Sequence, residues 1–335
     1  MPTTADVAAR ARVGVGTVSR VLNGSLGVRG VTHARVTRAI EELGYRPSAR
    51  ARALSLGRSF TIGVVVPFFT HPSAVARLRG VLEAVDATRY DVVLFNVASP
   101  AQRDEHLHAL AAGDRTDGGL MISLSPRDEE VELLRRSPVP VVLVDAEHPD
   151  LPHVGADDVA GGRLATRHLI DLGHERLAFV GDAPDPAFGF VSSARRRLGY
   201  LEALVAAGLG APPELLREGP HDRAVARALT LELLALDLPP TAVFAASDNQ
   251  ALGVLEAAAE RGLRVPEDLS VVGFDDLDQA AWAGLTTVHQ PLEESGRRGG
   301  ELLLAALAGH PPEPRQDALE LELRIRRTTA PPAAG

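Results

Sequence analysis

Acidic side chains follow directly after short apolar segments at several points of this 335-residue chain. Asp275 comes after the apolar residues 271–274, and Asp145 and Asp248 follow similar runs. In open α/β sheets, ligands bind beyond the carboxyl ends of the strands, and between lobes when there are two. Carboxylates accept hydrogen bonds from hydroxyl groups, so these residues indicate a site for a small polar molecule. A helix N-cap is the alternative for each Asp, above all for Asp248.

Signatures of catalysis and of metal binding are missing from the sequence. It has no Cys, which excludes a disulfide framework, a thiolate metal site and a Cys nucleophile. It has no G-x-S-x-G elbow, no P-loop and no H-E-x-x-H motif. His106 and His108 could suggest a metal site, but side chains two positions apart on a helix point in different directions. We therefore expect no enzyme, no metal and no cofactor.

The formal charge of −9 hides an uneven distribution. Residues 1–59 carry ten Arg against three acidic residues, a charge of +7, and the rest carries 25 Arg against 41 acidic residues, a charge of −16. A basic segment on an acidic body suggests that this segment binds nucleic acid. We find neither a secretory apolar segment nor a run long enough to span a membrane, so we expect a cytoplasmic protein.

The basic segment predicts three short helices. Thr3 and Asp6 form a capping box at the start of a helix over Thr4–Ala11. A second helix is expected over Val15–Leu22 and a third over residues 32–43, each with apolar side chains at spacings of 3 and 4. Helices of this size, with a three-residue turn between the first two, are typical of a helix-turn-helix domain.

The rest of the chain predicts a linker followed by α/β lobes. Residues 47–59 are rich in Ala and Arg and have little apolar surface, so a partner must order them. Beyond residue 60, β-branched runs alternate with helical stretches, which is typical of parallel sheets covered by helices on both faces. The tail at 330–335 is rich in Pro and Ala and is expected to be disordered. Strands are expected at residues 61–66, 91–95, 119–123, 141–145, 177–181, 242–246 and 270–274; seven strands favour two lobes.

The motifs Asp-Val-Ala-Ala-Arg-Ala at 6–11 and Thr-Val-Ser-Arg-Val-Leu-Asn-Gly at 17–24 resemble the lac repressor/galactose repressor family of transcription regulators. The resemblance continues in family order to the end of the chain, with further blocks at 41–47, 61–67, 161–166, 172–174, 240–244, 265–276 and 285–288. It implies a homodimer with a helix-turn-helix head (1–46), a hinge helix (47–59) and a two-lobed body of the periplasmic-binding-protein-like type (60–329). A periplasmic binding protein would have the body alone, and the Arg-rich head argues against it.

The implied function is that of a repressor. Its affinity for a near-palindromic operator in double-stranded DNA would be controlled by a small polar effector, a carbohydrate, bound between the lobes. The resemblance places the second helix in the major groove and implies base contacts by Val15, Gly16 and Arg20. Arg20 can donate two hydrogen bonds to guanine, although a solvated helix charge is the alternative. Thr17 and Ser19 would contact phosphates.

The implied hinge supplies further DNA contacts. Leu54 matches the family's leucine that enters the minor groove and kinks the duplex, whereas packing on the body is its alternative. Arg50 and Arg52 would neutralise phosphates. Asn23, which ends the second helix, completes this expected set.

Four positions of the head depart from the family pattern. Arg12 replaces the usual Gly or Asn of the turn, so a left-handed turn there would be strained. Gly14 and Arg29 stand where Ser usually caps the second and third helices. Gly16 costs about 1 kcal/mol relative to Ala within a helix. We therefore expect a head that is less stable than is typical.

The resemblance also implies effector contacts in the body. Asp275 and Arg196 match ligand-holding positions, and a carboxylate with a guanidinium suits sugar hydroxyls. Trp282 could stack on a sugar or fill the core, and the core is favoured. Residues 71–74 lack the aromatic pair of relatives, and this loss of aromatics with retained acids favours a carbohydrate over a purine. The full expected set is Ser73, Asp145, Ser192, Arg196, Asp248, Asp275 and Trp282.

Overall fold

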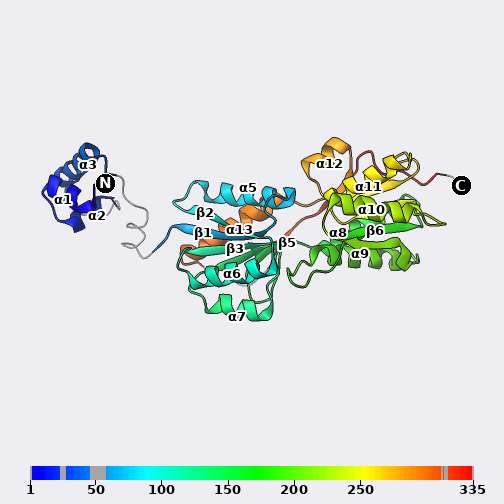
Figure 1. The fold of residues 1–335 in the computed structure, drawn as a ribbon, viewed down its shortest axis with the longest axis horizontal. Helices are drawn as coiled ribbons and strands as arrows, with labels where there is room; N and C mark the ends of the chain where they lie inside the picture. Colours follow the sequence, from blue (N-terminus) through cyan, green and yellow to red (C-terminus); the bar gives the residue numbers. More distant parts are fainter. Residues whose placement is uncertain (1, 23–27, 46–57, 311, 313–315, 334–335) are drawn as a thin grey trace. The chain divides into compact units, whose positions relative to one another are not determined.

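The computed structural model describes residues 2–22, 28–45, 58–310, 312 and 316–333. The chain divides into two compact units, Met1–Phe60 and Thr61–Gly335, called here the head and the body. Figure 1 shows the head in dark blue, with the body in the colours from cyan to red. Most of the expected hinge, together with Asn23, Arg50, Arg52 and Leu54, lies outside the described residues.

The head consists of three helices around a small apolar core. The helices are α1 (Thr4–Ala11), α2 (Val15–Leu22) and α3 (Gly30–Leu43). The first two have the predicted bounds, and α3 begins two residues earlier than predicted. The capping box is confirmed, since Thr3 N donates to the Asp6 carboxylate at 2.7 Å and Asp6 N donates to Thr3 Oγ1 at 3.3 Å. Fully buried side chains from all three helices meet in this core, namely Val7, Val18 and Val36.

The turn between α1 and α2 has the strain that its sequence predicts. Arg12 ends α1 in the left-handed conformation, with φ 52° and ψ 51°, which costs about 1–2 kcal/mol for a residue with a Cβ. Arg29 precedes α3 without a side-chain capping bond. Gly14 caps α2 only through its carbonyl, which accepts from Thr17 N and Val18 N.

The described residues of the body form two six-stranded sheets, one in each lobe. The first lobe has the order β11-β5-β4-β3-β1-β2, and the second has β12-β10-β9-β8-β6-β7. All neighbours are parallel except β10 and β12. The strands of the first sheet are β1 (Thr61–Pro67), β2 (Asp91–Val97), β3 (Gly118–Ile122), β4 (Val141–Val144), β5 (His153–Ala156) and β11 (Gln316–Leu319). Those of the second are β6 (Leu177–Asp182), β7 (Leu216–Gly219), β8 (Ala242–Ala245), β9 (Ser270–Asp275), β10 (Thr286–His289) and β12 (Glu322–Arg324).

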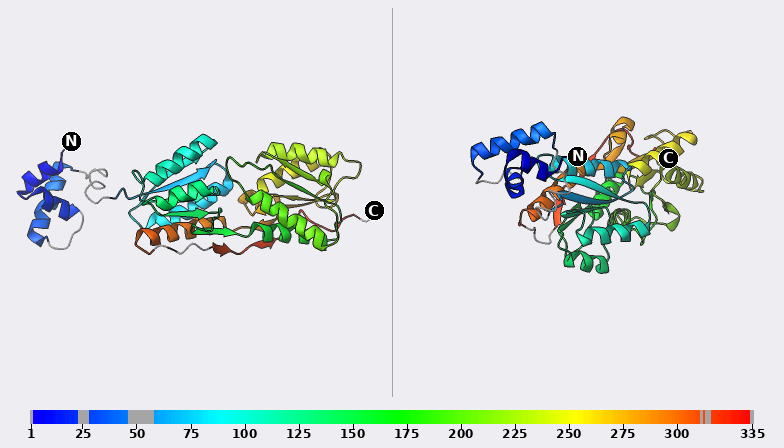
Figure 2. Two further views of the ribbon diagram at one scale, coloured as in Figure 1. Left: turned by 90° about the horizontal axis from the view of Figure 1, so that it is seen from below. Right: turned by 60° about the vertical axis from the view of Figure 1, so that its left-hand side comes forward.

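Helices cover both faces of each sheet (Figures 1 and 2). In the first lobe, α5 and α13 pack on one face, and α6 and α7 pack on the other. In the second lobe, α8 and α9 lie opposite α10, α11 and α12. The chain passes between the lobes after β5, after β10 and after β11. The helix bounds are α5 (Pro72–Asp86), α6 (Pro100–Ala112), α7 (Asp128–Arg136), α8 (Asp158–Asp171), α9 (Ser192–Ala206), α10 (Arg223–Leu234), α11 (Asp248–Glu260), α12 (Asp278–Ala283) and α13 (Leu292–Leu307), with a 3-10 turn at Pro213–Leu215.

The seven predicted strands are present, with ends that differ by up to two residues. Ser123 and Asp145 were predicted inside strands, but both have φ 55°, so they lie just beyond β3 and β4. The prediction missed β5, β7, β10, β11 and β12. These strands have only three or four residues, and several mix polar side chains or Gly with apolar ones, so they lack the continuous apolar run that marks a buried strand.

The expected disordered tail is ordered at its first residue. Ala330 N donates to Ser270 Oγ at 3.1 Å, and its carbonyl accepts from Ser270 Oγ at 3.0 Å and from His174 Nε2 at 2.9 Å. The expectation was wrong there because these partners lie far away in sequence, where composition cannot reveal them. Residues 334–335 lie outside the described residues.

Candidate DNA-reading helix and effector cavity

Helix α2 presents one side to the core of the head and the other to solvent. Val18 and Val21 are buried, whereas Val15, Gly16 and Arg20 are exposed. The side chain of Arg20 folds back along the helix, with Nε donating to the Gly16 carbonyl at 3.3 Å. No acidic residue lies in the first turn of the helix, so its N-terminal end is suited to anions. The half-buried Thr17 and Ser19 lie at the edge of this exposed side.

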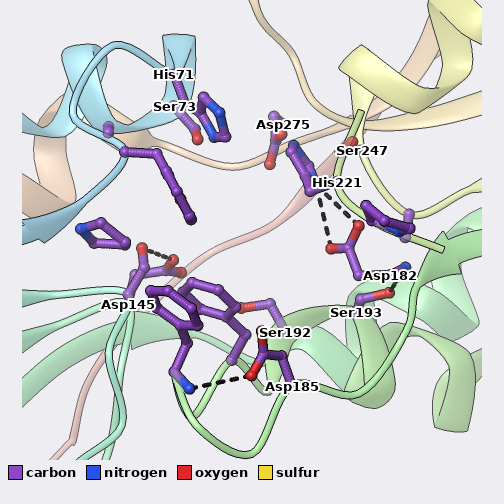
Figure 3. A pocket seen from close by; sticks show the side chains of 18 of the residues that line it. His71, Ser73, Asp145, Asp182, Asp185, Ser192, Ser193, His221, Ser247 and Asp275 are labelled. Atoms are coloured by element: carbon purple, nitrogen blue, oxygen red, sulfur yellow. Dashed lines mark hydrogen bonds and ion pairs between the residues drawn. The ribbon is translucent and has the colours of Figure 1, made fainter. Parts of the chain in front are cut away.

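A cavity of about 390 Å³ lies at the carboxyl ends of the strands in both lobes. Five of the predicted effector residues line it: Ser73, Asp145, Ser192, Arg196 and Asp275. Figure 3 shows Ser73, Asp145 and His71 on one side, and His221, Asp182, Ser193 and Ser247 on the other. The cavity therefore lies where the sequence predicts an effector site, beyond the strand ends and between the two lobes.

The wall from the first lobe centres on Asp145. Its Oδ2 accepts from Ser123 Oγ at 2.7 Å and pairs with Arg77 Nη2 at 2.8 Å. Its Oδ1 accepts from Gln290 Nε2 at 3.2 Å. Arg77 is buried and also donates to the Ser73 carbonyl at 3.4 Å. The guanidinium of Arg77 therefore neutralises Asp145 and fixes its orientation.

The wall from the second lobe centres on Arg196, which is only 6% exposed. Its Nε donates to Asp158 Oδ1 at 2.7 Å and its Nη1 to the Ala246 carbonyl at 2.7 Å. Its Nη2 donates to Gln290 Oε1 at 3.1 Å, and the guanidinium carbon lies 3.6 Å from the centre of the Phe274 ring. Since every nitrogen is engaged, Arg196 shapes the wall, and Gln290 connects it to Asp145 of the other lobe.

Asp275 ends β9 in a strained conformation with φ 117° and a side chain that is almost fully buried. Burial raises the pKa of its carboxyl group to about 6, although the positive charges of Arg196 and Arg77 oppose the shift. Its Oδ1 lies 3.6 Å from Arg196 Nη1, and no other described residue donates a hydrogen bond to this carboxylate. Asp275 therefore has acceptor capacity to offer a ligand.

Two imidazole rings of the cavity lining lie against each other, His71 from the first lobe and His221 from the second. Their centres are 5.5 Å apart. Burial alone would lower the pKa of His221, but its hydrogen bond to Asp182 at 3.0 Å outweighs burial and raises that pKa. Burial and the neighbouring His221 lower the pKa of His71. His221 is therefore the first of the two to be protonated.

Aromatic side chains form a further part of the lining. Phe188 and Phe190 are stacked with ring centres 5.2 Å apart, and Phe68 lies 5.6 Å from Phe188. All three line the cavity. Residues 71–74 lack the aromatic pair of relatives, but Phe68 from the segment after β1, and Phe188 and Phe190 from the segment between β6 and α9, supply rings to the cavity. The loss of the pair at 71–74 therefore does not by itself argue against a purine.

Two predicted effector residues do not line the cavity. Asp248 is buried at the start of α11, where it accepts from Thr287 Oγ1 at 2.6 Å and from Leu277 N at 2.8 Å. It therefore joins α11 to the segments around β9 and β10. Trp282 is 80% exposed, so it neither stacks in the cavity nor fills the core. Its helix α12 has six residues and buries only Ala280.

Sequence reasoning missed several lining or supporting residues. Asp182 ends β6 in the way that Asp275 ends β9, so the same rule could have found it. Arg77 and Gln290 carried no comparable signal. Among the described residues, no helix is long and apolar enough to span a bilayer, and no group of three or more His, Cys, Asp or Glu side chains is arranged to hold a metal ion.

Comparison with known proteins identifies the family. Residues 3–48 match the bacterial regulatory proteins of the lacI family, and residues 166–329 match the periplasmic binding protein-like domain. The chain is 37% identical to the HTH-type transcriptional regulator CelR of Thermobifida fusca, with 98% of both chains covered. It is 35% identical to the ribose operon repressor of Escherichia coli, over 91% of this chain and 92% of the repressor.

Solved structures give the same result. The lac repressor dimer bound to operator and an anti-inducer has a TM-score of 0.86 and 27% identity, over 98% of this chain and 99% of that one. The complex of CelR with cellobiose has a TM-score of 0.72 and 35% identity, over 98% of this chain and all (100%) of that one. With a helix-turn-helix head and a two-lobed periplasmic-binding-protein-like body, the chain belongs to the lacI family of bacterial transcriptional regulators.

Proposed function

We propose that the protein is a cytoplasmic repressor that binds a near-palindromic operator as a homodimer. Its affinity for the operator falls or rises when a sugar occupies the body cavity. The observation that carries the effector half of this proposal is the combination of stacked Phe188 and Phe190 rings with the carboxylates of Asp145 and Asp275. Aromatic faces pack against the apolar face of a sugar ring, and carboxylates accept from its hydroxyl groups.

The proposed binding of DNA is supported by the positive charge of the first 59 residues and by the exposed side of α2. The first 59 residues carry +7 on a chain of −9, so phosphates attract this segment. Arg20 would read a base, with Val15 and Gly16 close to the base edges and Thr17 and Ser19 on phosphates. Two heads of a dimer would each read one half-site.

The hinge would complete the interface with DNA. Leu54 would enter the minor groove at the centre of the operator, and Arg50 and Arg52 would bind the flanking phosphates. Asn23 would lie close to the DNA at the end of α2. These roles extend the resemblance to the family.

Effector binding in the cavity would change DNA affinity because side chains of both lobes line the cavity. An effector that bonds Asp145 of the first lobe and Asp275 of the second stabilises one relative arrangement of the lobes. A ligand can shift such an equilibrium only by its difference in affinity for the two arrangements. That change would be transmitted through the dimer to the hinges and heads.

The experiment is a thermal-shift screen of the full chain against neutral mono- and disaccharides and against purines, followed by operator titration with the hit. Two relatives motivate these two arms, a regulator solved with cellobiose and the PurR repressors. We expect a sugar to stabilise the body and to change operator affinity about 5–150-fold. Binding of purines alone, or a sugar without effect on operator affinity, would overturn the proposal.

A further inference from the structure

One segment of the second lobe packs into the first. Residues 183–190 lie in the segment that connects β6 to α9, yet Phe188 belongs to the apolar core of the first lobe and is only 8% exposed. Phe190 packs against the same core. The Gly189 carbonyl accepts from Ser125 N of the first lobe at 3.4 Å. Residues 183–190 therefore bridge the lobes beside the cavity that Phe188 and Phe190 help to line.

A buried guanidinium of the first lobe holds this bridge. Arg103 of α6 is 0% exposed, and its Nη1 donates to the Ala187 carbonyl at 3.2 Å. Its Nη2 donates to the Ser125 carbonyl at 2.8 Å and to Glu130 Oε2 at 2.6 Å. Glu130 in turn accepts from Arg127 N at 2.7 Å. One side chain thus joins α6, the start of α7 and the segment from the other lobe.

The energetics of this pair argue for a positioning role. Replacing a buried ion pair by apolar side chains of similar volume is often neutral or stabilising, so the presence of this pair does not by itself indicate a role in stabilising the first lobe. The buried Nε of Arg103 has no hydrogen-bond partner among the described residues, which adds to the cost. Arg103 donates a hydrogen bond to the Ala187 carbonyl, which an apolar side chain could not do.

Gly189 gives an independent indication that the contact is built in. It has φ +71°, and a Cβ at this position would lie 2.7 Å from the Ser125 carbonyl oxygen and 3.1 Å from Arg103 Nη1. The close approach between the lobes therefore needs glycine here. Any larger residue would have to lift the segment away from the first lobe.

We propose that residues 183–190 are a latch that holds the lobes together at one side of the cavity, and that Arg103 and Glu130 are the positioning residues that seat it. The latch also presents Phe188 and Phe190 to the cavity, so effector affinity depends on its seating. This last consequence rests on the function proposed above, whereas the latch itself does not.

The first test compares Gly189→Ala with Gly208→Ala in the full chain. Gly208 has the same φ of +71° but open space around its Cβ position, so it controls for backbone strain. In ligand-free protein, we expect hydrogen exchange of residues 183–190 to become at least about tenfold faster in Gly189→Ala and to stay unchanged in Gly208→Ala. Unchanged exchange in Gly189→Ala would overturn the latch.

Sugar affinity of the same two variants tests the dependence on the cavity. We expect the sugar found in the screen to bind about tenfold more weakly to Gly189→Ala and normally to Gly208→Ala. Faster exchange with unchanged sugar affinity would overturn the link to the effector. If no sugar binds the wild type, the proposed function fails while the exchange measurement still decides the latch.

The second test removes Arg103 and Glu130, the pair that positions the latch. Arg103→Met combined with Glu130→Gln avoids an unpaired buried charge, and we expect faster exchange in residues 183–190 with unchanged exchange in β1 and β3. Faster exchange in β1 and β3 as well would mean that the pair only supports the fold, and this would overturn the positioning role. Arg103→Lys keeps the charge but loses the forked donors, so we expect an intermediate effect.

Discussion

The head and the body keep their candidate functional side chains in opposite environments. In the head, Val15 and Arg20 are exposed, and the Arg20 guanidinium donates to the Gly16 carbonyl and to Thr17 Oγ1 of its own helix. In the body, Arg196 and Asp275 are 6% and 7% exposed and belong to a network of buried charges. A DNA-reading surface receives its counter-charge from phosphates, whereas a cavity must hold its own charges before the ligand arrives. Substitutions should therefore separate function from stability in the head and mix them in the body.

The head and the body also differ in what surrounds their strained backbone positions. Arg12 takes a left-handed conformation in a turn of the head. In the body, Asp275 and Asp276 have φ 117° and 61° at the end of β9, and Asp276 accepts from Arg326 Nη2 at 2.5 Å and from His289 Nδ1 at 3.1 Å. Strain at the end of β9 is thus held by partly buried ion-pair partners, as is common at functional sites, whereas strain in the head is a cost that a substitution can remove.

The largest effect is expected for Arg196→Met. It leaves Asp158 buried without its partner, which should cost about 3–5 kcal/mol of body stability. Arg163→Met is the matched control, because its ion pair with Glu202 at 2.7 Å also joins α8 and α9 but is exposed, and about 1 kcal/mol or less is expected there. Denaturant unfolding of both variants measures the loss. Equal losses of stability would contradict the difference between the buried and the exposed ion pair.

Arg20→Ala should affect function without affecting stability. Loss of a two-bond contact with guanine costs about 1–3 kcal/mol, or roughly 5- to 150-fold in operator affinity. Arg38→Ala removes an exposed charge of α3 and serves as the control, with a small, salt-dependent loss. Operator titrations at two salt concentrations separate the two variants. An equal loss in both would mean that Arg20 acts only through its charge.

The pKa values of the cavity predict a pH dependence. The pKa of Asp275 is raised to about 6. Between about pH 6 and pH 4 the folded state therefore binds a proton at this group more readily than the unfolded state, and the free energy of unfolding rises as the pH falls through this range. Sugar affinity should fall over the same range, because protonation removes an acceptor and charging of His71 beside His221 repels the opposite lobe. Asp275→Asn should flatten this profile in calorimetric titrations from pH 4 to pH 8. A profile of unchanged shape would exclude Asp275 as its source.

The smallest effect is expected for Arg12→Gly. Relief of the left-handed conformation should stabilise the head by about 1 kcal/mol and leave the body unchanged. Hydrogen exchange of α1 and α2 amides, compared with that of β1, measures the difference within one sample. Slower exchange in β1 as well would show that the change is not confined to the head.

Local signals predicted local structure well. The Thr3–Asp6 capping box and the 3 and 4 spacing gave the bounds of α1 and α2, and the residue type at Arg12 predicted its strain. Asp145 and Asp275 were found because parallel strands deliver their carboxyl ends to one edge. Within the site, sequence reasoning failed wherever a contact joins distant parts of the chain.

Three failures illustrate that limit. Arg77 gave no sign that it would turn inward to Asp145, since a lone Arg on an amphipathic helix is usually solvated. Phe188 packs in a lobe to which its neighbours do not belong. Trp282 was expected to be buried from its residue type, but a six-residue helix with one buried side chain has no room to enclose it. Each outcome depends on packing across the fold, which a single sequence does not record.

Control of operator affinity by the cavity is tested most directly by an operator titration of wild type and Asp275→Asn, each with and without the sugar found in the screen. We expect equal operator affinities without sugar, a change of at least about fivefold in the wild type when sugar is added, and a change of less than about twofold in Asp275→Asn at the same sugar concentration. An equal sugar response in the two proteins, or none in the wild type, would contradict the claim that the body cavity controls the head.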